Sequence, residues 1–111
     1  MLESGAEIWV RVTDLAVCRV FYRDVLGLGV PLVDSNFLCI FQLGAGSFLT
    51  LEPGRNREEG PNAPWLFLPE DPEELLDRLN TYGCRIRKKS AAGRSLLEVL
   101  DPEQNPVYLT D

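Results

Sequence analysis

The sequence predicts an α+β protein built from two tandem βαβββ modules. In each half of the 111 residues, an aspartate and a glycine bracket one apolar helical stretch: Asp14 with Gly27, and Asp71 with Gly83. Aspartate is a preferred helix N-cap, and glycine is the preferred residue just past a helix C-terminus. The two glycines lie 56 residues apart, and each is followed by enough chain for three short strands. A unit repeated at this spacing predicts a duplicated module. A βαββαβ ferredoxin-like arrangement is the alternative, but it leaves too many strands unplaced.

The first module, about residues 6–54, opens with a strand over residues 8–12, where apolar residues alternate with Trp9 and Arg11. Asp14 caps the predicted helix over residues 15–26. The apolar face of this helix is expected to contain residues spaced four apart: Val17, Phe21 and Val25. Three β segments follow, at about residues 30–33, 37–43 and 48–52, with turns at 34–36 and 44–46. Residues 53–61 form a polar linker.

The second module, about residues 62–111, repeats this order. A short apolar run at 65–68 precedes Asp71 and Pro72, which are typical of an N-cap and a first helical residue. The apolar face of this helix is expected to contain four residues: Leu75, Leu76, Leu79 and Tyr82. Three β segments are predicted at about residues 84–88, 95–100 and 106–110, with residues 101–105 as the turn between the last two.

Composition and charge exclude several function classes. The chain has 17 acidic and 11 basic residues, a net charge of −6, and no histidine. Imidazole chemistry, including a Ser-His-Asp triad or a His-ligated metal, is therefore excluded. Nucleic-acid binding needs a dominant basic face, so no nucleic-acid partner is expected. The basic stretch at residues 85–94 is interpreted as a solvated hairpin whose lysines protect a sheet edge.

The expected location is the cytoplasm. The three cysteines show no CxxC spacing. Cys18 and Cys39 lie in apolar runs, which is typical of small buried side chains in a reducing compartment. The N-terminus shows no signal-peptide pattern, and no apolar run reaches the ~18 residues that a membrane helix needs.

Two stretches resemble the vicinal oxygen chelate superfamily, the group of glyoxalase I, the bleomycin-resistance proteins and the extradiol dioxygenases. Val-Thr-Asp-Leu at 12–15, followed by Phe-Tyr-Arg-Asp-Val-Leu-Gly-Leu at 21–28, resembles its first-module signature. Asp-Pro-Glu-Gln-Asn at 101–105 resembles its Asp-Pro-x-Gly-Asn turn, with Gln104 in place of glycine. The resemblance runs from Glu7 to Leu109. It implies one open, cup-shaped mixed sheet of eight strands with the helices outside, a small-molecule ligand in the cup, and a homodimer.

The resemblance also implies four positions for the ligands of a divalent metal. The first is Glu7, which can bind a metal. The second lies near Phe48 or Thr50, with Glu52 one step further along the same face. The third falls at Ala63 or Pro64, and the fourth is Tyr108. Because a metal site needs three or four suitable donors, no metal cofactor is expected, and Glu7 is the one candidate ligand. An oxygen-only Mg or Mn site made by Glu7, Glu52 and Glu98 is the alternative.

Strand alternation predicts which residues line the cup. The expected ligand-binding residues are these: Glu7, Trp9, Arg11, Phe48, Thr50, Glu52 and Tyr108. Aromatic faces beside carboxylates suit a planar or cationic organic ligand.

Several interpretations stay open at this stage. The three aromatic residues Trp9, Phe48 and Tyr108 are alternatively part of the core or of a dimer interface. Glu7 and Arg11 are alternatively members of a cross-strand charge pattern. Glu98 is alternatively the partner of Arg85 or Arg87 in a salt bridge.

The leading functional hypothesis is a metal-free protein that binds and sequesters a small aromatic or cationic molecule, as the bleomycin-resistance proteins do. The alternative is a lyase, isomerase or dioxygenase-like enzyme that uses Glu7 with a divalent metal. In that case Glu7 and Glu98 are the candidate catalytic carboxylates, because burial among aromatic residues raises a carboxyl pKa toward useful values.

Overall fold

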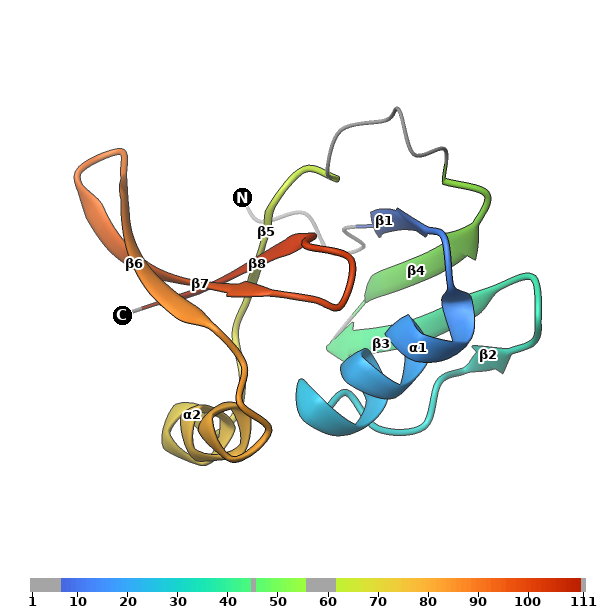
Figure 1. The fold of residues 1–111 in the computed structure, drawn as a ribbon, viewed down its shortest axis with the longest axis horizontal. Coiled ribbons are helices and arrows are strands. Elements are labelled where there is room, and N and C mark those ends of the chain that lie inside the picture. The colour runs from blue at the N-terminus through green and yellow to red at the C-terminus, as the bar shows by residue number, and fades with distance from the viewer. Residues whose placement is uncertain (1–6, 45, 56–61, 111) are drawn as a thin grey trace. The chain divides into compact units, whose positions relative to one another are not determined.

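The computed structural model describes residues 7–44, 46–55 and 62–110. The chain divides into two compact units, Met1–Gly60 and Pro61–Asp111, and each unit contains one four-stranded mixed sheet (Figure 1). The element order is strand, helix, strand, strand, strand in both units. The predicted α+β class and the tandem βαβββ organisation are therefore confirmed. No helix in the described ranges is long and apolar enough to cross a membrane.

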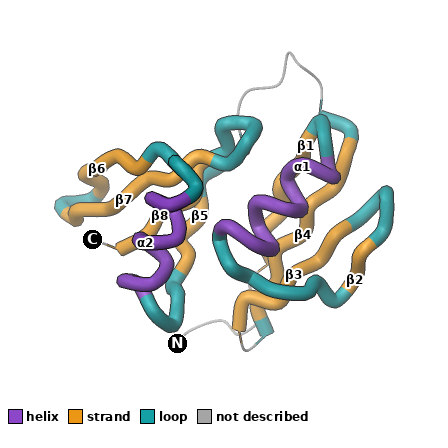
Figure 2. Tube along the Cα trace, turned by 60° about the horizontal axis from the view of Figure 1, so that its bottom comes forward, coloured by secondary structure: helices purple, strands orange, loops and turns teal. Residues whose placement is uncertain are grey.

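The first unit contains β1 (Glu7–Val12), α1 (Leu15–Val20), the π-helical turn η1 (Phe21–Val25), β2 (Val33–Asp34), β3 (Cys39–Gly44) and β4 (Ser47–Pro53). The strand order in its sheet is β1-β4-β3-β2. The β1–β4 pair is parallel, and the other pairs are antiparallel. Figure 2 shows α1 crossing these strands on one face of the sheet, and α1 contacts β4.

The helix of the first unit begins as predicted but has a different apolar face. Asp14 Oδ1 accepts a hydrogen bond from the Val17 backbone N–H at 3.2 Å. The predicted face is wrong at Val17, which is 50% exposed. The buried positions follow the steps of three and four that start at Leu15: Leu15, Cys18, Phe21, Tyr22, Val25 and Leu26. From Phe21 onward the helix is π-helical, and Leu26 N–H donates to the Phe21 carbonyl at 2.8 Å.

The predicted strand at residues 30–33 is short in the structure. Only Val33 and Asp34 pair with β3, and Val30 is 89% exposed. The chain just before Val33 does not extend this strand, because Gly29 has a positive φ of 80° and Pro31 has no backbone N–H to donate to the sheet. The next two strands form within about two residues of their predicted bounds.

The second unit contains β5 (Trp65–Phe67), α2 (Pro72–Thr81), β6 (Ile86–Ala91), β7 (Arg94–Leu100) and β8 (Pro106–Thr110). The strand order is β5-β8-β7-β6, with β5 parallel to β8. Asp71 Oδ1 caps α2 by accepting from the Glu74 N–H at 3.1 Å. Strand β6 extends beyond the predicted residue 88, because Ala92 and Gly93 adopt positive φ values of 53° and 75° in a two-residue hairpin turn.

The apolar face of α2 is largely as predicted. Leu75 and Leu79 are buried at 2% and 0% exposure. Leu76 is partly buried. The prediction is wrong at Tyr82, which is 59% exposed, because Tyr82 is the C-cap residue and lies past the last helical turn.

The turn at residues 101–105 is built around the buried side chain of Asp101. Asp101 Oδ1 accepts from the backbone N–H groups of Glu103 and Asn105, both at 2.8 Å. Gln104 has a φ of 69°, which explains why the similar turn in the superfamily has glycine there. Asn105 Oδ1 in turn accepts from Asn62 Nδ2 at 2.7 Å, so this turn holds the start of the second module.

Candidate functional site

Six of the predicted ligand-binding residues share one face of the sheet in the first unit. The parallel register pairs Glu7 with Phe48, Trp9 with Thr50, and Arg11 with Glu52. Residues directly opposite one another point to the same side of a sheet, so these six side chains form one surface, here called the Trp9 face. The residues that alternate with them, Val10, Val12, Leu49 and Leu51, are buried at 0–1% exposure.

Trp9 is the most accessible large side chain of this face. It is 54% exposed, whereas Thr50 opposite it is buried at 5%. Phe48 is partly buried beside Glu7. A tryptophan with half of its surface accessible on a rigid sheet offers an aromatic face to a ligand.

The charges of the Trp9 face are unevenly paired. Arg11 Nε lies 3.7 Å from Glu52 Oε1, and Arg11 Nη2 donates to the Gly54 carbonyl at 3.1 Å. The cross-strand charge pattern considered for Glu7 and Arg11 therefore joins Arg11 to Glu52. Glu7 is exposed and makes no ion pair with any base in the described part of the chain. The face thus has one carboxylate available to an incoming cation.

The other two candidate residues, Glu98 and Tyr108, lie side by side in the second unit. The β7–β8 register pairs them directly, and the β6–β7 register places Arg87 on the other side of Glu98. Arg87 Nη2 donates to Glu98 Oε1 at 2.7 Å, and Lys89 Nζ lies 3.8 Å from Glu98 Oε2. The salt bridge considered for Glu98 is confirmed with Arg87 as the partner. A buried carboxylate held by two cations is poorly suited to act as a general base.

The residues at the four implied metal positions do not fit a divalent ion. Glu7 lies opposite Phe48, which has no donor atom, and Ala63 and Pro64 have apolar side chains. Tyr108 lies beside a salt-bridged carboxylate. The oxygen-only Mg or Mn site is also disfavoured, because two of its three carboxylates, Glu52 and Glu98, each form an ion pair with an arginine. Within residues 7–44, 46–55 and 62–110, no three Cys, Asp or Glu side chains gather as a possible metal site.

None of the three cysteines provides a reactive thiol. Cys18 and Cys39 are fully buried, as predicted from their apolar surroundings. Burial raises the pKa of the Cys39 thiol to about 11, and the nearby Asp34 carboxylate adds to this effect. Burial also raises the pKa of Cys84. Thiols with raised pKa values carry little thiolate near neutral pH and are weak nucleophiles.

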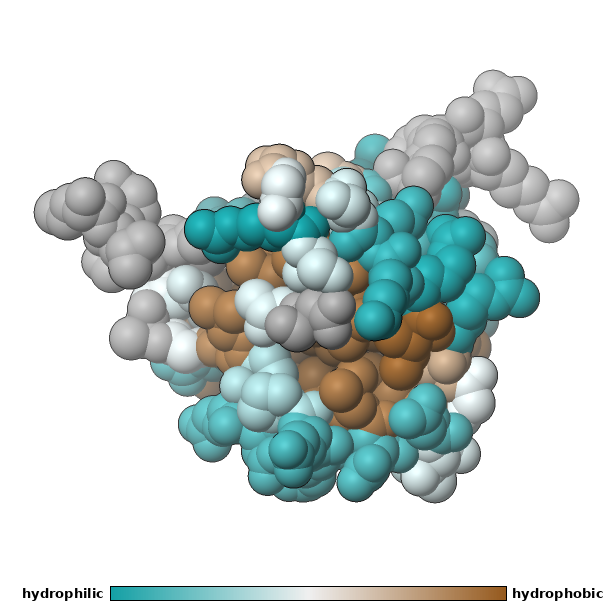
Figure 3. Space-filling view, turned by 90° about the vertical axis from the view of Figure 1, so that its left-hand side faces the viewer, coloured by the Kyte–Doolittle hydropathy of each residue, from teal (hydrophilic) through white to brown (hydrophobic). Residues whose placement is uncertain are grey.

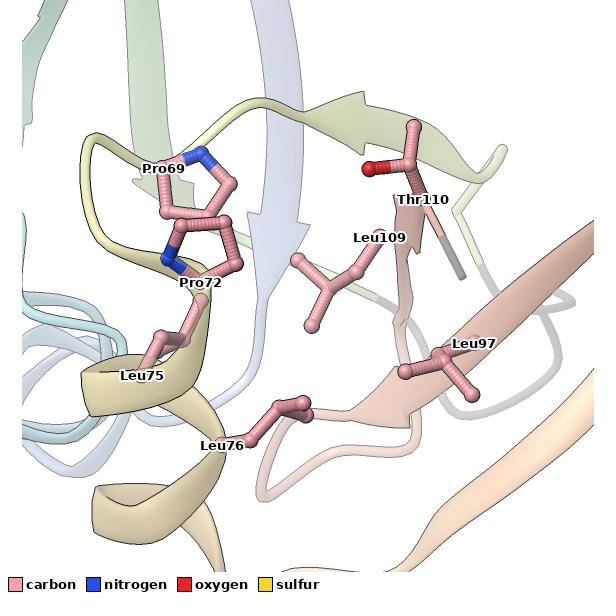
Figure 4. Close-up of a pocket in the computed structure, with 7 residues that line it drawn as sticks. All are labelled: Pro69, Pro72, Leu75, Leu76, Leu97, Leu109 and Thr110. Carbon is pink, nitrogen blue, oxygen red and sulfur yellow. The ribbon is translucent and has the colours of Figure 1, made fainter.

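Sequence reasoning missed two features of the second unit. The first is Lys89, the second cation beside Glu98, whose signal is its two-residue spacing from Arg87 on the same strand. The second is an apolar hollow between α2, β7 and β8 with an empty volume of about 230 Å³ that includes open solvent. Figure 4 shows Leu75 and Leu76 of α2 facing Leu97 and Leu109 across it. Figure 3 shows apolar residues gathered within a hydrophilic margin on one side of the protein.

Comparisons with solved structures define the class of fold. The structure matches a lactoylglutathione lyase from Agrobacterium tumefaciens with a TM-score of 0.72 and 21% identity, over 97% of this chain and 92% of that chain. It matches a glyoxalase / bleomycin resistance protein from Catenulispora acidiphila with a TM-score of 0.74 and 22% identity, over 96% of both chains. It also matches the oxidase ChaP-H1 with a TM-score of 0.70 and 19% identity, over 100% of this chain and 97% of that chain.

No family model matches the sequence. No curated protein matches it either. The fold is nevertheless that of the glyoxalase and bleomycin-resistance proteins, and it is the fold of the vicinal oxygen chelate superfamily that the two sequence stretches resemble.

Proposed function

We propose that this protein binds a small planar cation on the Trp9 face, without a metal ion. The observation that supports this most directly is Trp9, which is 54% exposed on a sheet face whose opposite side is fully packed. A cation placed over an indole face is attracted by the ring quadrupole, by about 0.5–2 kcal/mol depending on how far the site is desolvated.

Glu7 provides the charge complement to the indole. It lies two residues from Trp9 on the same strand and face, so the two Cα atoms are about 7 Å apart. A two-ring heterocycle stacked on Trp9 reaches that carboxylate. Arg11, on the other side of Trp9, has Glu52 and the Gly54 carbonyl as partners, which reduces its repulsion of a cation.

A resistance-type role, in which the protein holds a small molecule without converting it, agrees with this chemistry. One structure with the same fold is described as a glyoxalase / bleomycin resistance protein. The described carboxylates supply one unpaired donor at the implied metal positions, Glu7, whereas metal-dependent lyase or dioxygenase chemistry needs at least three. The enzyme alternative is therefore the less supported one and is an outcome of the tests below.

Calorimetric titration with 1-methylquinolinium and its uncharged counterpart 1-methylnaphthalene tests the proposal. We expect the cation to bind more tightly than the neutral compound, because only the cation gains from both Glu7 and the indole quadrupole. Trp9→Leu is expected to weaken cation binding about tenfold, and Glu7→Gln about three- to tenfold. Glu73→Gln, which removes an exposed carboxylate from the first turn of α2, is the matched control and should leave the affinity unchanged.

Metal analysis provides the second arm of this test. Purified protein is expected to bind the cation equally well before and after treatment with a chelator. One stoichiometric divalent ion per chain that Glu7→Ala removes would instead support the enzyme alternative. Turnover of a methylglyoxal–thiol adduct or a catechol, lost in the same variant, would do so as well.

The homodimer that the superfamily resemblance implies is part of the same proposal. Light scattering coupled to gel filtration measures it directly. A mass close to twice 12.5 kDa is the expected result, and a monomer mass at all concentrations tested would contradict it.

A further inference from the structure

Four residues form one row across all four strands of the second unit. The strand registers pair Leu66 with Tyr108, Tyr108 with Glu98, and Glu98 with Arg87, in the order β5, β8, β7 and β6. Directly opposite residues point to the same side of a sheet, so this row, here called the Arg87 row, occupies one face. Leu97 and Leu109 alternate with it and face α2 (Figure 4). The row therefore lies on the face away from the helix.

The β6 end of the row has an excess of positive charge. Lys89 lies two residues beyond Arg87 on β6, on the same face, and both cations pair with the single carboxylate of Glu98. The Glu98 side chain is 8% exposed, whereas the side chains of Arg87 and Lys89 are 54% and 43% exposed. The carboxylate thus lies beneath two cations that remain accessible to solvent.

Both cations keep hydrogen-bond donors for a further acceptor. Arg87 has five N–H donors, and Nη2 is the guanidinium nitrogen that bonds Glu98. Lys89 Nζ is 3.8 Å from Glu98, which is an ion pair but too long for a hydrogen bond. Because Glu98 already restrains both side chains, an added anion meets two pre-oriented cations and loses less side-chain entropy on binding.

The β5 end of the row is apolar. Leu66 is 48% exposed, and Tyr108 is partly buried beside it. Three strand spacings separate Arg87 from Leu66, or about 14 Å. We infer that the Arg87 row binds a small organic monocarboxylate, with the carboxylate on Arg87 and Lys89 and the apolar body over Tyr108 and Leu66. This inference does not depend on the proposed function of the Trp9 face, which selects the opposite charge.

The wild-type chain provides the first test, by NMR titration with 2-naphthoate and its uncharged analogue 2-naphthamide. Naphthoate is expected to shift backbone resonances of β6, β7 and β8 and to bind about three- to tenfold more tightly than naphthamide. The difference should shrink in about 0.5 M salt, where exposed charges are screened. Equal affinities for the two compounds would overturn the inference, whether or not the Trp9 face binds cations.

Charge-matched variants of β6 provide the second test. Lys89→Gln is expected to weaken naphthoate binding about three- to tenfold. Lys88→Gln is the matched control, because Lys88 pairs with Leu97 and therefore lies on the opposite face of the same strand. Arg87→Gln should have an effect at least as large as Lys89→Gln. If Lys88→Gln weakened binding as much as Lys89→Gln, the anion would be responding to net charge alone and the inference would be wrong.

Discussion

Asp101 binds Asn105 through both of its carboxylate oxygens. Oδ1 accepts the backbone N–H of Asn105 at 2.8 Å, and Oδ2 accepts Nδ2 of its side chain at 2.9 Å. The two residues are 2% and 1% exposed, so these bonds are shielded from water. Because Asn105 also accepts from Asn62, the pair joins both ends of the second module.

Asp101→Asn is expected to lower the free energy of unfolding by about 2–4 kcal/mol. The substitution keeps the size of the side chain but replaces one carboxylate oxygen with an NH2 group. At least one N–H group that now donates to Asp101 then faces another donor, and leaving a buried polar group without a partner lowers stability. Urea denaturation of the intact chain measures the effect. Asp77→Asn, at an exposed position of α2, should change stability by less than about 0.5 kcal/mol. Equal losses in the two variants would show that the Asp101 network contributes nothing specific.

Gln104→Gly is expected to stabilise the protein by about 1 kcal/mol. Gln104 has a φ of 69°, in the left-handed region that is unfavourable for residues with a Cβ atom. Glycine avoids this strain. It also increases the conformational entropy of the unfolded chain, which offsets part of the increase in the free energy of unfolding. Thermal or urea unfolding checks the sign. Gln104→Ala is the control and should show no stabilisation; a glycine variant less stable than the alanine variant would refute the interpretation.

Stability should fall as the pH rises from about 9 toward 11, in part because of Cys39. Burial is the main reason that the pKa of this thiol rises from its ordinary value of 9.0 to about 11 in the folded protein. Below pH 9 the thiol is neutral in both states, so it adds no pH dependence; between the two pKa values the unfolded chain gains a thiolate that the folded chain does not. Denaturation between pH 8 and 11 should show a shallower decline in Cys39→Ala than in wild type. Parallel declines would contradict the assigned shift.

The sequence predicts sides of strands well, because alternation depends on neighbouring residues alone. Trp9 and Arg11 were expected on one face of their strand, and Phe48 and Glu52 on one face of another. Which residue lies opposite which depends on hydrogen bonds between strands about 40 residues apart, and no local pattern encodes that register. The pairing of Arg11 with Glu52, which leaves Glu7 available, therefore emerged only from the structure.

The two helices differ in how well the sequence predicts them. The second helix has strong signals at both ends, and its start at Pro72 after Asp71 was predicted correctly. The first helix continues into a π-helical turn, which carries no recognisable sequence signal. The apolar face expected from a four-residue spacing is wrong at Val17, which lies in the α-helical part before this turn and outside the buried stripe that starts at Leu15.

The central claim is that Trp9 and Glu7 together bind a planar cation, and the fluorescence of Trp9 alone tests it most directly. Trp65 is 7% exposed, and its indole N–H has no hydrogen-bond acceptor among the described residues. Trp65→Phe keeps an aromatic ring beside Phe67 and leaves Trp9 as the sole tryptophan. Titration of this variant with 1-methylquinolinium should give saturable quenching that is weaker when Glu7→Gln is added. Linear quenching that never saturates, with the same slope in both variants, would contradict the account.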